Sequence, residues 1–267
     1  MVNTPNIRFK GFTDDWEQRK FPEFVSFYNG LTYTPNDIQE MGTLVLRSSN
    51  VKNGEIVDAD NVYVNDKVAT SENVQVGDII VVVRNGSRAL IGKHAQIKAS
   101  MPNTVIGAFM SGIRSGQSSF VNALLDTSAF ENEIAKNMGA TINQITGYMF
   151  SKMEFMVPSE EEQQQIGQYF SNLDHLITLH QRKCDETKKL KKFMLQKMFP
   201  KKDEKKPEIR FAGFTDDWEQ RKLIDYLEVS SEKNRDNRFT KDDVLSVSGE
   251  YGIVNQIEFQ GRSFAGA

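Results

Sequence analysis

Short apolar runs broken by Gly, Asn and Asp fill the sequence from about Pro22 to Pro158. The runs TLVLRSSNVKNGEIV, NVYVND, VQVGDIIVVVRNGS and LIGKHAQIKA are typical of strands joined by turns. Asn53-Gly54 predicts a hairpin turn, and Val76-Gly77-Asp78 predicts a turn into a buried strand, IIVVV. This part of the chain is therefore predicted to contain a sheet.

Helical periodicity appears first in SSFVNALLDTSAFENEIAKNM, residues 118–138, where apolar residues recur every three or four positions. Gly139 follows this run and is a suitable C-cap, because glycine adopts the left-handed backbone that ends many helices. We therefore expect one helix beside the sheet.

A much longer helical pattern begins at Ser159 with SEEEQQQ, in which serine can cap the helix and the glutamates suit the positive end of its dipole. An apolar seam then recurs at alternating steps of three and four, which is typical of a coiled coil. Its positions are Ile166, Phe170, Leu173, Ile177, His180, Cys184 and Thr187, continued after a slip by Leu190, Met194 and Met198. The helix would run about 40 residues, or roughly 60 Å at 1.5 Å per residue.

A fourteen-residue phrase occurs twice: IRFKGFTDDWEQRK at Ile7–Lys20 and IRFAGFTDDWEQRK at Ile209–Lys222. The spacing of roughly 200 residues exceeds that of solenoid repeats, so each unit must hold a whole domain. We predict an α+β protein, in which a mixed α/β domain (residues 1–158) precedes a long coiled-coil-type helix (159–200). A charged linker (201–208) and the start of a second domain (209–267) follow.

Composition places the chain among ordinary soluble proteins, with 39% apolar and 26% charged residues and a net charge of −3. Neither a run of 18 apolar residues nor a signal-peptide pattern is present, so we expect a cytoplasmic protein with no membrane association. Its single cysteine, Cys184, excludes an internal disulfide. Residues 79–125 contain no Asp or Glu but carry several basic groups, which suggests an anionic partner.

Catalytic motifs are missing from the sequence. It contains no G-x-G-x-x-G loop, and residues 86–94 depart from a phosphate-binding loop in spacing and in having His94 where the Mg²⁺ ligand should be. His175 and His180 are five residues apart, on different helix faces, and no zinc spacing is found. The Pro-Pro motif usual in adenine methyltransferases is also missing. The chain is not visibly an enzyme, although a nuclease with an unrecognised site stays an alternative.

Three polar segments carry residues suited to DNA, because Arg pairs with guanine, Asn with adenine, and Ser and backbone amides with phosphates. They are residues 47–50, 84–88 and 138–144. Each segment has a second interpretation as a polar turn that contacts only water. An interaction protein that uses the long helix for assembly, without DNA readout, is the main alternative function.

The repeated phrase, LRSSNVKNGEI, GDIIVVVRNGS, GATINQI and the helix EEQQQIGQYFSNLDHLITLHQRKCDETKKLKKFMLQKMF together resemble the specificity subunits of type I restriction-modification systems. The resemblance covers nearly the whole chain. It implies a non-catalytic subunit in which two recognition domains, held apart by long antiparallel helices, read a bipartite site in double-stranded DNA. Methyltransferase and restriction subunits would be the partners, and S-adenosylmethionine would bind the methyltransferase rather than this chain.

The resemblance also implies which residues contact DNA: Arg47, Ser48, Asn50, Arg84, Asn85, Ser87, Arg88, Lys93, Thr141, Asn143 and Gln144. The helix seam would include Ile166, Phe170, Leu173, Ile177, Leu190 and Met194. Two full repeats would need roughly 400 residues, so the sequence would stop within its second recognition domain. We therefore expect the seam to pair with a second copy, or to be covered by a methyltransferase subunit.

Overall fold

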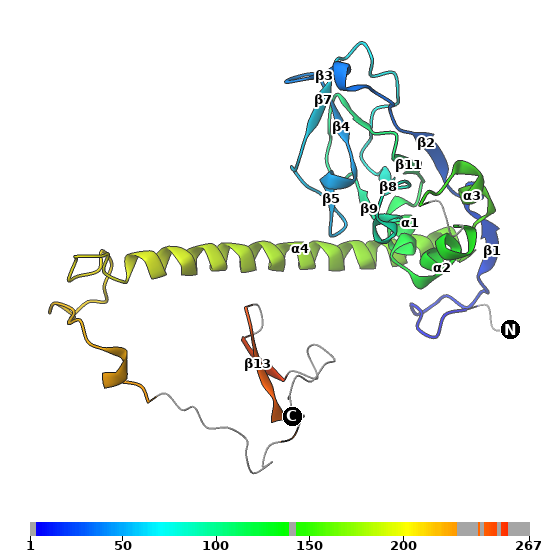
Figure 1. The fold of residues 1–267 in the computed structure, drawn as a ribbon. Helices are drawn as coiled ribbons and strands as arrows, with labels where there is room; N and C mark the ends of the chain where they lie inside the picture. The colour runs from blue at the N-terminus through cyan, green and yellow to red at the C-terminus, as the bar shows by residue number, and fades with distance from the viewer. Residues whose placement is uncertain (1–3, 139–142, 229–239, 241–242, 250–251, 256–267) are drawn as a thin grey trace. The chain divides into compact units, whose positions relative to one another are not determined.

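The computed structural model describes residues 4–138, 143–228, 240, 243–249 and 252–255. The chain forms two compact units, Met1–Thr187 and Lys188–Ala267, and each is described separately. Strands and helices are both abundant in the first unit (Figure 1).

Two four-stranded sheets form the first unit. One is antiparallel, in the order β2 (Ser26–Asn29), β11 (Met110–Arg114), β8 (Ile79–Val82) and β9 (His94–Gln96). The other is mixed, in the order β10 (Thr104–Ile106), β4 (Thr43–Leu46), β7 (Val62–Val64) and β3 (Ile38–Gln39), with β10 and β4 parallel. Two pairs are separate: β1 (Glu17–Lys20) with β12 (Glu154–Val157), and β5 (Val51–Lys52) with β6 (Glu55–Ile56).

Strand β8 explains the uninterrupted apolar run IIVVV, because it is buried on both faces. Ile79 and Val81 join a core shared with the helices, whereas Ile80 and Val82 join a second core that includes Leu46 of β4. Alternate side chains of a strand point to opposite faces, so only a strand covered on both sides needs apolar residues at every position.

Both predicted turns are confirmed. Asn53 and Gly54 join β5 to β6 with φ angles of 53° and 72°, the left-handed pair that a tight hairpin requires. Gly77 also has a positive φ, 95°, and the Asp78 amide donates to the Gln75 carbonyl at 3.0 Å immediately before β8.

The single helix predicted over residues 118–138 is wrong, because this segment forms two helices, α1 (Ser118–Leu125) and α2 (Ser128–Asn137). Thr127 separates them: its hydroxyl donates to the Leu124 carbonyl at 2.7 Å and accepts from the Phe130 amide at 3.4 Å. It thus acts as the N-cap of α2. The expected C-cap, Gly139, lies outside the described residues. Helix α3 (Gly147–Lys152) follows.

Helix α4 (Glu160–Lys197) confirms the long helix, with 38 residues and a length of about 57 Å at 1.5 Å per residue. The Ser159 hydroxyl accepts from the Glu162 amide at 3.4 Å, as expected of an N-cap. Gly167 lets α4 approach α1 closely, since a Cβ there would lie 2.6 Å from the Phe120 amide nitrogen. Short 3₁₀ turns occur at Phe21–Glu23, Pro35–Asp37, Ser48–Asn50, Arg88–Leu90 and Leu223–Asp225.

The seam of α4 is largely exposed in the single chain. Phe170, Leu173 and Ile177 have exposed fractions of 46%, 36% and 65%, and Leu190 is also exposed, whereas Ile166 and Met194 are half-buried. Cys184 lies exposed on the same stripe. Within the described chain, therefore, the apolar stripe has no covering layer along most of its length.

The first copy of the repeated phrase packs against the start of α4. Both oxygens of the Glu162 carboxylate accept from Arg8, each at 2.7 Å, and Glu162 is fully buried. The ring of Phe9 meets Tyr169 edge to face at 5.7 Å between centroids. The second unit holds the second copy of the phrase and an antiparallel pair, β13 (Leu245–Ser248) and β14 (Gly252–Asn255).

The observed sheets and long helix confirm the α+β fold class. The predicted domain limits at residues 158, 200 and 208 stay predictions.

Candidate DNA interface

The segment after β8 provides the centre of the candidate site. The amides of Val83 and Arg84 both donate to the carbonyl of Phe109, at 2.9 and 3.2 Å. Arg84 also forms an isolated β-bridge with Gln144, and the Ile145 amide donates to the Val83 carbonyl at 2.8 Å. The chain leaving β8 is therefore fixed on both sides before it turns outward.

All three polar segments singled out in the sequence meet here. The Asn85 side-chain amide donates to the Ser48 hydroxyl at 3.3 Å, and the Lys93 ammonium donates to the Ser48 carbonyl at the same distance. The Asn143 side-chain amide donates to the Gly86 carbonyl at 3.1 Å. We call residues 47–50, 84–88 and 143–144 the loop cluster. Thr141, also expected to contact DNA, lies outside the described residues.

The basic groups of the acid-free run have different environments. Arg114 binds Asp78 and Glu72, and Lys98 binds Glu55, so these charges are neutralised within the protein. Arg84 and Arg88 are exposed, and neither pairs with a carboxylate in the part of the chain that the structure describes. Exposed, unpaired guanidinium groups can bind phosphate or the edge of guanine.

Two of the expected contact residues support the loops instead of pointing outward. Asn50 is fully buried: its side-chain oxygen accepts from the Arg47 amide, and its nitrogen donates to the Ala59 carbonyl at 2.7 Å and to Asn61 at 2.9 Å. Arg47 is held by Asp60, whose carbonyl and carboxylate both accept at 2.6 Å. We therefore leave Asn50 out of the proposed contact set, and Arg47 would have to exchange Asp60 for a DNA group.

Lys93 and His94 lie at the edge of the cluster. Lys93 is half-buried and bound to Ser48, which leaves its charge close to the cluster. His94 is buried, with Nδ1 3.1 Å from the Gly92 carbonyl and Nε2 3.5 Å from Asp126. His94 is therefore held inside the protein at the start of β9, and we propose no phosphate contact for it.

Phe109 belongs to the same surface but was not among the sequence candidates. Its side chain is 55% exposed, and the Arg84 guanidinium lies over its ring, 5.1 Å from the centroid. Beside it is a hollow of about 550 Å³ whose lining includes Tyr33, Arg47 and Ser48. In the sequence, the only signal was an aromatic residue in the turn GAFM inside the acid-free run.

A buried polar network connects the strands of the sheet beneath the loop cluster. The Tyr28 hydroxyl donates to Asp78 at 2.7 Å, while Arg114 donates to both oxygens of the same carboxylate at 2.9 and 3.1 Å. Burial, followed by the hydrogen bond to Asp78, raises the pKa of Tyr28. The hydrogen bond to Asp78 likewise raises the pKa of Arg114, so this residue stays charged.

Among the described residues, no group of three or more His, Cys, Asp or Glu side chains could hold a metal ion. None of the described helices is long and apolar enough to span a membrane.

Comparison with known proteins identifies the family. Residues 13–189 match the model of the type I restriction modification DNA specificity domain, and the chain belongs to that family. It is 24% identical over 169 residues to the StySPI specificity subunit of Salmonella potsdam and to the EcoKI specificity subunit of Escherichia coli K12. Each alignment covers 60% of this chain and 36% of the relative, so the chain spans about a third of the length of these relatives.

The fold of this chain is similar to that of a solved structure. A structure described as showing assembly and conformational transition of the type I R-M system aligns over 69% of this chain and 45% of its own, at 18% identity and a TM-score of 0.50. The HsdS subunit from Thermoanaerobacter tengcongensis aligns over 73% of this chain and 50% of its own, at 16% identity and a TM-score of 0.49.

Proposed function

We propose that this chain is the DNA-recognition subunit of a type I restriction-modification complex and that it reads DNA with the loop cluster. The observation that carries the proposal is convergence: three segments far apart in sequence meet on one surface that presents two unpaired arginines. Family membership supports the same function.

In the proposed mechanism, recognition and chemistry are separate. Arg84 and Arg88 donate to base edges or phosphates, and Ser48, Asn85, Ser87, Asn143 and Gln144 set the register of the protein on the duplex. Lys93 adds positive charge at the edge. Methylation of adenine, with S-adenosylmethionine, belongs to a partner methyltransferase, and cleavage belongs to a restriction subunit. The chain itself is non-catalytic and works in the cytoplasm on one half of a bipartite site.

The test compares the wild-type chain with the variant Arg84→Ala/Arg88→Ala. The DNA probe is a duplex that carries the site found by mapping methylation in cells containing the chain and its methyltransferase. Loss of two phosphate contacts would reduce the slope of log K against log salt by about 1.8, and loss of a guanine contact would also relax specificity. Binding is measured by fluorescence anisotropy at several salt concentrations.

Arg19→Ala is the control, because Arg19 is a half-buried arginine of the first unit that binds Glu17 on β1, outside the loop cluster. It should leave the affinity and the salt slope unchanged. Wild-type binding by the double variant would contradict DNA readout by these loops and favour the alternative, an assembly module that uses α4. DNA cutting by the purified chain with Mg²⁺ alone would contradict the non-catalytic role.

We also propose that α4 holds the parts of the complex at a fixed spacing and provides a surface on which they dock. Its exposed seam is too apolar to suit permanent contact with water, since Phe170, Leu173 and Ile177 follow one another along one stripe. A second copy of the chain, bound through antiparallel α4 helices, would cover it and place two identical readers on one site.

A further inference from the structure

Phe109 is an exposed aromatic residue whose backbone is held firmly beside the loop cluster. Just before it, the Ala108 amide donates to the Leu31 carbonyl at 2.9 Å. The Phe109 carbonyl accepts from the amides of Val83 and Arg84 at 2.9 and 3.2 Å. The backbone is therefore fixed by two other segments of the chain, while the side chain stays 55% exposed.

The Phe109 ring forms a pair with the Arg84 guanidinium, which lies over it at 5.1 Å from the centroid. A guanidinium is attracted to the face of an aromatic ring, so each side chain helps to position the other. Arg84 pairs with no carboxylate among the residues that the structure describes. One point on the surface thus presents a free positive charge and an apolar ring together.

An apolar hollow of about 550 Å³ lies next to this ring. Its lining includes the half-buried Tyr33 and the buried Met110. The charged groups of its lining bind each other, since Arg47 donates to the Asp60 carboxylate at 2.6 Å. The hollow therefore suits an apolar group better than a charged one.

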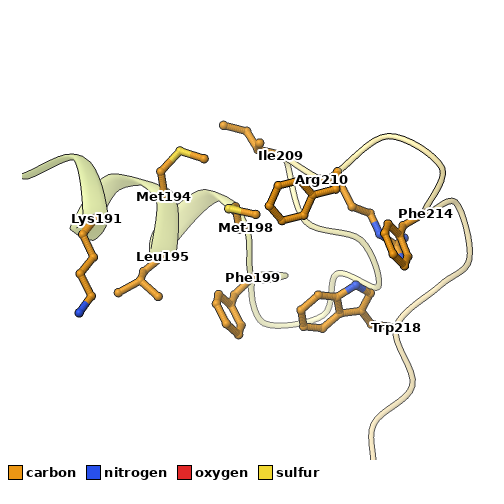
Figure 2. Close-up of a pocket in the computed structure, with 10 residues that line it drawn as sticks. Lys191, Met194, Leu195, Met198, Phe199, Ile209, Arg210, Phe214 and Trp218 are labelled. Atoms are coloured by element: carbon orange, nitrogen blue, oxygen red, sulfur yellow. The ribbon is translucent and has the colours of Figure 1, made fainter. Parts of the chain in front are cut away.

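An apolar hollow alone does not identify its ligand. A second one, of about 460 Å³, lies in the second unit at the end of α4, where Phe199 meets Trp218 edge to face at 5.7 Å (Figure 2). The contacts of the described residues do not show what covers it. The hollow beside Phe109 differs because the unpaired Arg84 next to it indicates an anionic partner.

A DNA duplex has one apolar group that fits such a surface. Base edges in the major groove present hydrogen-bond donors and acceptors, and the C5-methyl of thymine is the apolar exception. Phenylalanine is among the side chains that contact this methyl group. Extruding a whole base into the hollow would add the cost of unstacking it, which a methyl contact avoids.

We infer that Phe109 is a specificity-determining residue, which recognises a thymine through its C5-methyl group. The methyl group lies against the Phe109 ring at the edge of the hollow, beside the DNA group that Arg84 binds. Thymine is preferred over cytosine there, because cytosine has no C5-methyl. This inference rests on the proposed function, since it requires the loop cluster to face the duplex.

The test replaces each thymine of the mapped site with deoxyuridine, one position at a time. Deoxyuridine pairs as thymine does and lacks only the C5-methyl group. Replacement at one position of the half-site should weaken wild-type binding about fourfold, since burial of one methyl-sized group contributes about this factor. Phe109→Ala should bind the thymine and deoxyuridine duplexes equally. Binding is measured by fluorescence anisotropy.

Two further variants isolate the contact. Phe109→Leu keeps an apolar side chain without a ring and should still distinguish thymine from deoxyuridine. Val76→Ala removes an exposed apolar side chain in the turn before β8, at the other end of that strand from Arg84. It should keep the full fourfold difference. Circular dichroism confirms that every variant is folded.

The inference is overturned if no deoxyuridine weakens wild-type binding. It is also overturned if Phe109→Ala keeps the fourfold difference, since Phe109 would then act only by holding Arg84. Increased fluorescence of 2-aminopurine opposite that thymine would show an opened base pair, and the hollow would then hold a whole base instead of a methyl group. The proposed function survives these results if Arg84→Ala/Arg88→Ala still loses affinity. If that double variant binds as the wild type does, both fail.

Discussion

At the scale of single residues, Gly112 shows how closely the sheet beneath the loop cluster is packed. It stands opposite Tyr28 in the register of β11 and β2, and a Cβ at Gly112 would lie 2.0 Å from Cζ of the Tyr28 ring. The Arg114 guanidinium lies over the same ring, 4.5 Å from its centroid. The Tyr28 ring is therefore closely packed.

We predict that Gly112→Ala destabilises the first unit by about 1–3 kcal/mol or more, because an extra methyl group in a filled core forces its neighbours apart. Gly116→Ala is the control, since no atom lies within 4 Å of its added Cβ. Urea unfolding followed by circular dichroism measures the difference. Equal midpoints for the two variants would show that the sheet can relax around position 112.

Tyr28 also predicts a pH dependence. Burial, and then the bond to Asp78, raises the pKa of Tyr28 in the folded state, whereas tyrosine in the unfolded chain titrates near 10. The folded state therefore retains the proton longer, so this stabilisation is complete below about pH 10 and is lost as the pH rises beyond it.

Thermal melts between pH 8 and 11 test this dependence by comparing the wild type with Tyr28→Phe. The variant is expected to start less stable, because Asp78 loses one donor, and then to lose less stability above about pH 10. The lysines and other tyrosines titrate in both proteins. Parallel curves would mean that Tyr28 does not contribute to the alkaline loss.

Residue chemistry in the sequence selected Arg84, Ser87 and Arg88 as candidates, and all three are exposed, as polar groups in a turn usually are. It did not separate them from Asn50, which looks equally suited to a base but is buried by Ala59 and Asn61, residues of the following loop. Phe109 was missed for a related reason. Its exposure and its contact with Arg84 depend on two strands that meet only in the folded chain.

At the scale of elements, turns with a strict backbone requirement were predictable and helix breaks were not. Asn53-Gly54 predicted the hairpin reliably, because few residues tolerate the positive φ angles that this turn requires. Thr127 interrupts a continuous helical pattern without Gly or Pro, so periodicity alone favoured one helix over residues 118–138. In the structure, the Thr127 hydroxyl caps α2, and the segment forms two helices.

We predict that Thr127→Ala destabilises the first unit by about 1 kcal/mol, because the hydroxyl that caps α2 is lost. Thr127→Ser keeps that hydroxyl and should be close to the wild type. Hydrogen exchange of the amides in α2 locates the effect. If both variants unfold alike, the break between α1 and α2 is set by packing of Phe120 and Phe130 rather than by the cap.

At the scale of the whole molecule, the repeated phrase predicted duplication but could not show what each copy contacts. The contacts of Arg8 and Phe9 come from a helix more than 150 residues away in sequence, so no local pattern contains them. Likewise, the helical periodicity predicted the seam of α4 but left open whether this chain or another covers it.

The last prediction concerns that seam. If a second copy covers α4, the chain forms a dimer, and Ile177→Lys should convert it into a monomer because a charge would be buried in an apolar interface. Light scattering coupled to size exclusion measures the mass. Glu186→Lys introduces the same residue nine positions later, on the opposite face, and should stay dimeric. A wild-type monomer with intact helix content at micromolar concentration would contradict self-association and leave a methyltransferase subunit as the cover of the seam.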